Sequence, residues 1–206
     1  AFSSMKVPGQ LAKQVAVLGV PLLLNEVLWS GGMTVLNQCY SLRGLEVVSA
    51  VNISGTVSNL FFCAFFAMGT TVSIIVGQLL GADELERAVD EDRKLIAFSV
   101  VLCCAVGVVM ALLAPLIPRI YNTTDSVKRI AEDLLLVAAV MMPANAFTNA
   151  CYFTLRSGGK TIITFVFDCA FVWAVNIPAA FFLSRCTSMG ILPMYIIVQS
   201  LDLIKC

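Results

Sequence analysis

The chain has 206 residues, of which 59% are hydrophobic and only 13% are charged, with 13 basic side chains, 13 acidic side chains and no histidine. A soluble domain carries about 25% charged residues, so this chain has half the charge needed to cover a water-facing surface and is expected to lie in a lipid bilayer. The absence of a basic excess argues against nucleic-acid binding, and the lack of histidine argues against triad hydrolases and histidine-based metalloenzymes.

Long apolar runs predict the elements of the fold. A helix that crosses a ~30 Å hydrocarbon core needs about 20 apolar residues. Charged residues separate six runs of this kind, which predict an all-α membrane protein with one domain, a six-helix bundle: 15–40, 47–80, 95–118, 130–155, 161–183 and 190–206. The last run is short and still apolar where the sequence stops, so we expect a truncated sixth helix.

The first run contains an acidic residue, Glu26, near its middle. An ionised carboxylate at the centre of a bilayer costs about 2.5–3.5 kcal/mol, so something must offset that cost. No Lys or Arg lies well inside a run to pair with it. We therefore interpret Glu26 as a site for a cation or a proton, assisted by Asn25 and Trp29. The alternative is a protonated or paired Glu26 that only holds helices together.

The second run carries a stripe of small and polar residues at helical spacing: Ser49, Asn52, Thr56, Asn59, Cys63, Thr70, Ser73 and Gly77. Such a stripe either lines an aqueous path or lets a neighbouring helix approach closely. The two asparagines favour a cavity along the first half of the run, and the small residues favour packing along the second half.

The densest group of charges separates the second run from the third. Gly81 followed by Asp83 and Glu84 is typical of a helix end and a new helix start, so residues 84–94 are predicted to form a short charged helix at the membrane surface. Eight basic residues fall on one side of the predicted topology and five on the other. This bias favours an orientation with both termini in the cytoplasm. The expected location is the plasma (inner) membrane.

Two later runs contain further polar residues. In the fourth run Pro143 interrupts the helical hydrogen bonds, and Asn145 and Asn149 follow on one side. Amides bind a cation only together with a carboxylate, so both are interpreted as supporting residues. The fifth run carries Asp168, which shares a helical face with Asn176. Asp168 is either a second site residue or an acid that water or a loop lysine can reach.

Three motifs, in this order and spacing, give the chain a family resemblance: PLLLNE at 21–26, VGQLLGA at 76–82 with ERA at 86–88, and LRSGGKT at 155–161. The chain resembles the second, C-terminal six-helix lobe of the multidrug and toxic compound extrusion (MATE) transporters. The resemblance implies an efflux antiporter of twelve helices in two lobes. It would exchange Na⁺ or H⁺ for organic, often cationic, drugs, and it would not be an enzyme.

The resemblance also implies roles for particular residues. The family's coupling acid in the first helix of this lobe matches Glu26, so no cofactor besides the coupling ion Na⁺ or H⁺ is expected. Some members have a second acid in the fourth helix, where this chain has Asn145, and Asp168 is a candidate replacement. The drug would bind at the interface with the other lobe, and the expected lining residues are Asn52, Asn59, Phe61, Phe65, Met141, Phe147 and Trp173.

Three alternatives to a drug antiporter remain open: a flippase, a membrane-integral enzyme and a structural subunit. A flippase for lipid-linked precursors or polysaccharides belongs to the same superfamily, but it would need basic residues inside its cavity. A membrane-integral enzyme would need a nucleophile and a base, and without histidine the choice falls to pairs such as Asp168 and Ser184, which lie too far apart on one helix. A structural membrane subunit would leave Glu26 without a purpose.

Overall fold

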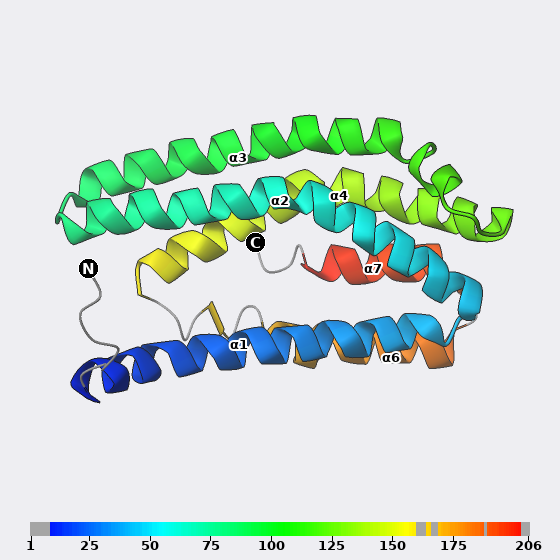
Figure 1. Cartoon of the computed structure of the whole chain (residues 1–206), viewed down its shortest axis with the longest axis horizontal. Coiled ribbons are helices and arrows are strands. Elements are labelled where there is room, and N and C mark those ends of the chain that lie inside the picture. The colour runs from blue at the N-terminus through cyan, green and yellow to red at the C-terminus, as the bar shows by residue number, and fades with distance from the viewer. Residues whose placement is uncertain (1–8, 160–163, 166–168, 188, 203–206) are drawn as a thin grey trace, which may run out of the picture.

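A computed structural model of the chain describes residues 9–159, 164–165, 169–187 and 189–202. Within these ranges every regular element is a helix (Figure 1). The α-helices are α1 (Gly9–Ser41), α2 (Leu45–Gly81), α3 (Leu85–Leu113), α4 (Asp125–Ser157), α6 (Ile177–Cys186) and α7 (Ile191–Asp202), with a 3₁₀ helix η1 (Ile117–Ile120) and a π-helix η3 (Val172–Asn176). The prediction of an all-α membrane fold is confirmed.

Three of these helices are long and apolar enough to cross a membrane, as judged by length and composition over the described residues. They are α2, α3 and α4, while the described parts of α6 and α7 are shorter apolar helices. The ends of α1, α2 and α4 lie within a few residues of the predicted runs, except that α1 begins earlier, at Gly9. The assignment of six membrane spans stays a prediction.

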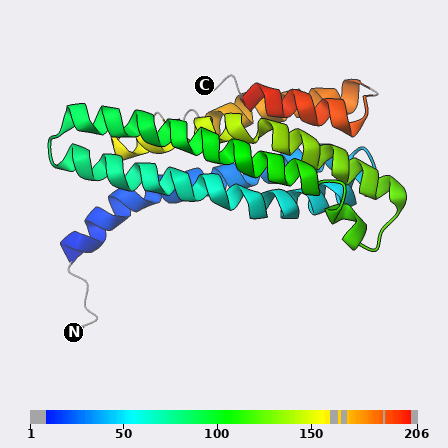
Figure 2. The ribbon, with the colours of Figure 1, turned by 90° about the horizontal axis from the view of Figure 1, so that it is seen from above.

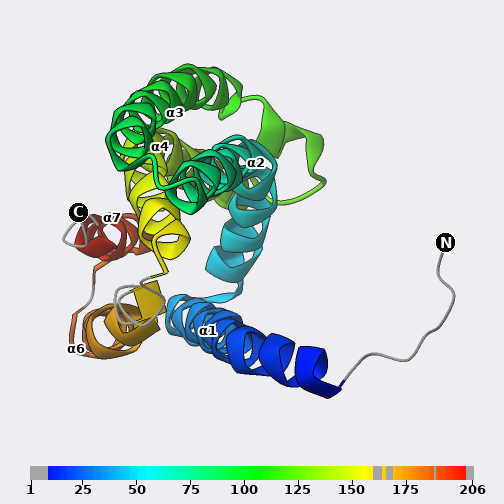
Figure 3. The same cartoon turned by 90° about the vertical axis from the view of Figure 1, so that its left-hand side faces the viewer.

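The helices form two groups: α2, α3 and α4 make the first, and α1, η3, α6 and α7 make the second. The second group contacts the first through α2 and α4. Along the chain α2, α3 and α4 alternate in direction, and the three helices pack extensively on one another (Figures 1 and 2). On the other side, α1 packs against α6 and η3, and α7 lies beside α4 and α6 (Figure 3). The first half of α1 extends away from the other helices and exposes apolar side chains, among them Val17 and Leu23.

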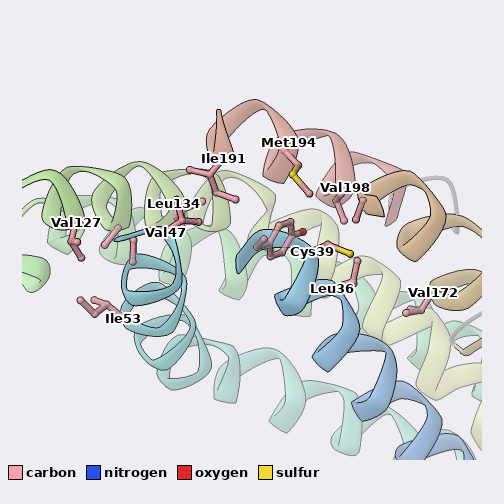
Figure 4. Packing of buried hydrophobic residues seen from close by; sticks show 14 residues of the cluster. Leu36, Cys39, Val47, Ile53, Val127, Leu134, Val172, Ile191, Met194 and Val198 are labelled. Carbon is pink, nitrogen blue, oxygen red and sulfur yellow. The ribbon is translucent and has the colours of Figure 1, made fainter. Parts of the chain in front are cut away.

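Two clusters of buried side chains hold these groups together. One joins α2, α3 and α4 around Met110, Leu135 and Met142. The other joins α1, α2, α4, η3, α6 and α7, and includes Leu36 and Met194 (Figure 4). Because the second cluster draws on both groups, burial of apolar surface favours one packed lobe over two separate bundles.

The charged segment after α2 differs from its prediction. The expected helix end at Gly81 is present, and Asp83 adopts the left-handed conformation (φ 62°) in the connecting turn. The prediction of a separate surface helix over residues 84–94 is wrong, because α3 runs without a break from Leu85 to Leu113. Its first turns are stabilised by ion pairs at helical spacing, such as the Lys94 Nζ pair with Asp90 Oδ2 at 2.6 Å. These charges therefore belong to a helix that continues into the apolar run.

The third helix also ends earlier than predicted. Residues 114–118 were expected to complete the third span, but α3 ends at Leu113 and the chain turns into η1. Pro115 and Pro118 lie in this region. Proline lacks the amide hydrogen and clashes with the preceding turn, so a continuous α-helix cannot pass through both positions without loss.

A glycine on α3 allows its close approach to α4. Pro143 cannot donate a backbone hydrogen bond to Ala139 O, yet α4 continues through it. A Cβ atom built on Gly107 would lie 2.9 Å from Ala139 O. The carbonyl that proline frees is therefore covered by the bare backbone of α3.

Arg43 joins the end of α1 to the end of α6. The guanidinium of Arg43, in the turn after α1, donates to Leu183 O at 2.8 Å and to Thr187 O at 2.7 Å. Both acceptors are carbonyls at the end of α6, where helical carbonyls lack partners and a positive charge is favourable. The turn between α1 and α2 is thereby fixed to the end of α6.

Candidate functional site

Glu26 lies on the open face of α1. Its side chain is exposed, as are those of Leu23 and Val27 on the same stretch of helix. In the part of the chain that the structure describes, no hydrogen bond or ion pair engages the Glu26 carboxylate. A carboxylate on an apolar helix with no partner among the described residues is available to an ion, to water or to a neighbouring domain.

The preceding residue, Asn25, points the opposite way and is only 5% exposed. Its Nδ2 donates to the Tyr152 hydroxyl of α4 at 3.4 Å. The Cys169 thiol donates to both Asn25 O and Asn25 Oδ1, each at 3.1 Å. Since successive helical residues are rotated by about 100°, anchoring Asn25 inward turns Glu26 toward the open face. Asn25 therefore fixes the rotation of α1.

The two predicted amides of α4 differ in their surroundings. The Asn149 Oδ1 atom is buried and has no hydrogen-bond partner among the described residues. It lies against Gly69 of α2, where a Cβ atom would come within 2.5 Å of it and within 2.4 Å of the Phe153 ring. Asn145 is half-buried. No contact joins either amide to Glu26 in the described structure, so their role in ion binding stays a prediction.

The fifth predicted run is described only in part, and Asp168 lies outside the described residues. Trp173 is in η3, and its indole Nε1 donates to Leu28 O of α1 at 3.0 Å, one turn from the Asn25 contacts. Trp173 is 44% exposed, so its ring also forms part of the surface beside Leu28. A π-helix has a widened turn, and such turns occur frequently at functional sites.

The predicted cavity residues separate into three kinds. Asn52, Asn59 and Phe147 are exposed on the surface of the lobe, and Phe61 and Met141 are half-buried. Phe65 is 7% exposed and belongs to the α2–α3–α4 core, which favours a packing role over a place in the cavity wall.

The polar stripe of α2 is largely satisfied by its own helix. Thr56 Oγ1 donates to Asn52 O at 2.8 Å, and Thr70 Oγ1 donates to Ala67 O at 2.8 Å. In the second half, a Cβ atom built on Gly77 would lie 4.0 Å from Ser157 Cβ of α4. The Gly77 contact agrees with packing at the end of the stripe, and a cavity along its first half stays a prediction.

One buried polar contact was not expected from the sequence. Asn176 Nδ2, at the end of η3, donates to Asp202 Oδ1 of α7 at 2.8 Å. Asp202 is thus a further acid within a predicted apolar run. The sequence does place Asp202 inside the sixth predicted run, 190–206. Because Asp202 lies near the end of that run, it resembles a charged residue that flanks a membrane span.

Removing the Asn25 amide tests its anchoring role. We expect Asn25→Leu to lower the free energy of unfolding by about 1–3 kcal/mol, because the Tyr152 hydroxyl and the Cys169 thiol lose a buried partner. The matched control is Asn52→Leu, which changes an exposed asparagine and should have an effect within about 0.5 kcal/mol. Thermal unfolding of the purified full-length protein measures both. Equal stability of the two variants would contradict the anchoring role.

Comparison with known proteins places this geometry in a family. The sequence model described as MatE matches residues 21–182. The chain is 28% identical over 171 residues to the multidrug resistance protein NorM of Aliivibrio fischeri, an alignment that covers 81% of this chain and 36% of that protein. It is 23% identical over 194 residues to the probable multidrug resistance protein YoeA of Bacillus subtilis, covering 93% of this chain and 42% of the relative.

Solved structures show the same fold. A crystal structure of a MATE in complex with MaL6 superposes with a TM-score of 0.84 at 15% identity, covering 97% of this chain and 45% of that chain. An outward-facing MATE family transporter gives a TM-score of 0.82, also at 15% identity, and covers 99% of this chain and 46% of the other. The chain therefore spans less than half the length of the proteins that it matches.

Proposed function

The chain belongs to the MatE family, and from this premise we propose that it is one lobe of a secondary active efflux antiporter. The transporter would export organic, often cationic, compounds in exchange for Na⁺ or H⁺. The names of the relatives, which are multidrug resistance proteins, support this function. The chain covers 45% of a solved MATE chain, which supports a second lobe as its partner in the membrane.

One observation carries the proposal: Glu26 is an exposed carboxylate on an apolar helix and has no partner among the described residues of its own lobe. Binding of H⁺ or Na⁺ would remove its net charge and with it the cost of leaving water. If the two access states of the transporter differ in how much water reaches Glu26, ion binding shifts the balance between them. Asn25, anchored inside the lobe, would keep Glu26 on the face where this exchange occurs.

The organic compound would bind where this lobe faces the other one. Asn52, Asn59 and Phe147 are exposed, so their side chains are accessible from outside the lobe. Asn145, Asn149 and Asp168 remain proposed contributors to the ion site, and Phe61, Met141 and Trp173 to the cavity. We also propose the topology expected from the basic residues, with both termini in the cytoplasm.

Dye transport by the full-length protein tests this function. Proteoliposomes or cells loaded with a fluorescent cationic dye would be given a Na⁺ gradient, a pH gradient or neither. We expect one of the two gradients to accelerate dye efflux, and an ionophore that collapses the gradient to return efflux to the passive leak. Efflux that is the same with and without either gradient would contradict an antiporter.

A further inference from the structure

The connection between α3 and α4 forms a cavity that the proposed ion and drug sites do not use. It lies at one end of the bundle, where the chain turns from α3 into α4 (Figure 1). Its volume is about 440 Å³, within the range of about 300–1,000 Å³ that small-molecule sites have. Besides two prolines and Arg119 of the connection, the lining consists of four charged residues of α4: Asp125, Lys128, Arg129 and Glu132.

Helical spacing gathers the four α4 residues on one face. Asp125, Arg129 and Glu132 follow one another at steps of four and three positions, which makes them neighbours on the helix surface. The connection is held against α4 by its own packing, because η1 contacts α4 and Pro118 is buried. Ile117 also packs on the α2–α3–α4 core. Arg119 of η1 therefore lines the same cavity as the charged face of α4.

The charges that line this cavity are only partly paired. Lys128 Nζ lies 3.6 Å from Asp125 Oδ1. Neither Arg119, Arg129 nor Glu132 forms an ion pair with any residue that the structure describes. Guanidinium groups match the oxygens of a phosphate, and a carboxylate accepts hydrogen bonds from an ammonium group. The unpaired groups thus suit a ligand that carries a phosphate and an ammonium together.

Exposed apolar side chains adjoin the cavity. Leu112 at the end of α3, Leu116 in the connection and Ile120 of η1 are all exposed, and Ile120 is 79% exposed. Tyr121 follows directly and is also exposed. Tyrosine is enriched where a membrane meets water, and apolar side chains at that level contact lipid chains. A ligand with acyl chains would cover this surface, whereas a small soluble ligand would leave it in water.

The charged start of α4 is long enough to cross the headgroup layer of a membrane. Its charged residues extend from Asp125 to Asp133, and an apolar stretch begins at Leu134. Residues 125–133 rise by about 12 Å along the helix. The polar layer on each side of a bilayer is about 5–8 Å thick. The cavity, lined by the first turns of α4, therefore lies at the level of lipid head groups.

We propose that this cavity binds the head group of an aminophospholipid, a lipid with a phosphate and a primary ammonium. The phosphate oxygens would accept hydrogen bonds from Arg119 and Arg129, and the ammonium would donate to Glu132. The acyl chains would lie beside Leu112 and Ile120. The proposal rests on the membrane fold of the lobe and on the lining of the cavity, and it does not depend on antiport.

Lipid binding to the purified full-length protein tests the site. Native mass spectrometry would follow titration with phosphatidylethanolamine, phosphatidylglycerol or phosphatidylcholine of identical acyl chains. Phosphatidylglycerol lacks the ammonium, and phosphatidylcholine has an ammonium without N–H donors. We expect the wild type to bind phosphatidylethanolamine at least about threefold more tightly than either of the others. Tighter binding of phosphatidylglycerol would overturn the proposal, because it would show a site for net negative charge.

Two variants assign the groups of the head. Glu132→Gln removes the acceptor charge, so we expect it to lose the preference for phosphatidylethanolamine and to keep its affinity for phosphatidylcholine. Arg119→Gln combined with Arg129→Gln should weaken binding of all three lipids at least about tenfold. The matched control is Arg93→Gln, an exposed arginine in the first turns of α3, which should bind all three as the wild type does. A preference that persists in Glu132→Gln, or unchanged affinity in the double variant, would overturn the assignment.

The change in selectivity also guards against loss of folding, since an unfolded protein cannot lose its preference for one lipid and keep its affinity for another. Glycerophosphoethanolamine, which is the same head group without acyl chains, distinguishes a lipid from a soluble ligand. We expect it to compete only at concentrations at least about a hundredfold higher than the lipid. Competition at equal concentration would overturn the lipid assignment. Dye efflux is not the readout, so this result is separate from the test of antiport.

Discussion

Replacing Glu26 by glutamine is expected to lower gradient-driven dye efflux strongly. Glutamine has nearly the same shape but cannot ionise, so it removes the charge and leaves the packing of the exposed face unchanged. The differential stabilisation from one carboxylate at the bilayer centre is about 2.5–3.5 kcal/mol, which corresponds to about 70- to 400-fold in an equilibrium constant. We therefore expect the gradient-dependent part of the efflux rate to fall at least about tenfold.

The experiment uses the full-length protein at matched amounts in the membrane. Its control is Glu46→Gln, the same change in the first turn of α2, where the side chain accepts a hydrogen bond from Ser126 Oγ at 2.7 Å. An amide oxygen can still accept that bond, so Glu46→Gln should transport nearly as the wild type does. Gradient-dependent efflux that persists in Glu26→Gln would exclude this residue as the coupling group.

The largest loss of stability is expected from Gly107→Ala. The added Cβ would lie 2.9 Å from Ala139 O, a backbone atom that can move only if α3 and α4 separate. Overpacking of this kind costs about 1–3 kcal/mol, and contact with the backbone places this variant at the upper end. We expect the free energy of unfolding to fall by about 2–3 kcal/mol, although alanine favours a helix by about 1 kcal/mol over glycine.

A second glycine provides the comparison. A Cβ atom built on Gly55, within α2, has no heavy atom within 4 Å, so Gly55→Ala gains helix propensity without a clash. We expect its Tm to equal or exceed that of the wild type, and the Tm of Gly107→Ala to fall by about 4–12 °C. Thermal unfolding of the purified full-length variants measures both. A Gly107→Ala protein as stable as Gly55→Ala would show that the two helices do not depend on this contact.

Much of the fold could be predicted, because the length and hydropathy of the apolar runs determine that they form helices. Apolar runs of sufficient length have few structures open to them in a bilayer, so helices were the expected result. The continuity of α3 was not predicted, because charges spaced by three and four residues are compatible with a surface helix and with the start of a longer one. Neither Gly nor Pro stands between Leu85 and Leu95 to end a helix, and charged side chains such as Lys94 and Asp90 pair with one another within α3.

The candidate site was less predictable because α1 is apolar on most sides. Its sequence identifies Glu26 but does not reveal which face turns inward, since little amphipathicity distinguishes the faces. The inward direction of Asn25 depends on Tyr152, which is 127 residues away in the chain. The place of Trp173 likewise depends on Leu28, at a separation of 145 residues. Such contacts become visible only in three dimensions.

The division of the lobe into two groups sets an order for its assembly during synthesis. The helices α2, α3 and α4 follow one another in the chain and pack mainly on one another, so this group can pack early. By contrast, α1 packs mainly on α6, whose residue Leu183 accepts the Arg43 hydrogen bond across 140 residues. At about 5–20 residues per second, the ribosome needs about 7–28 s to produce that partner. During this interval α1, with Glu26 and the still unpaired amide of Asn25, must be kept in the membrane by lipid or by the insertion machinery.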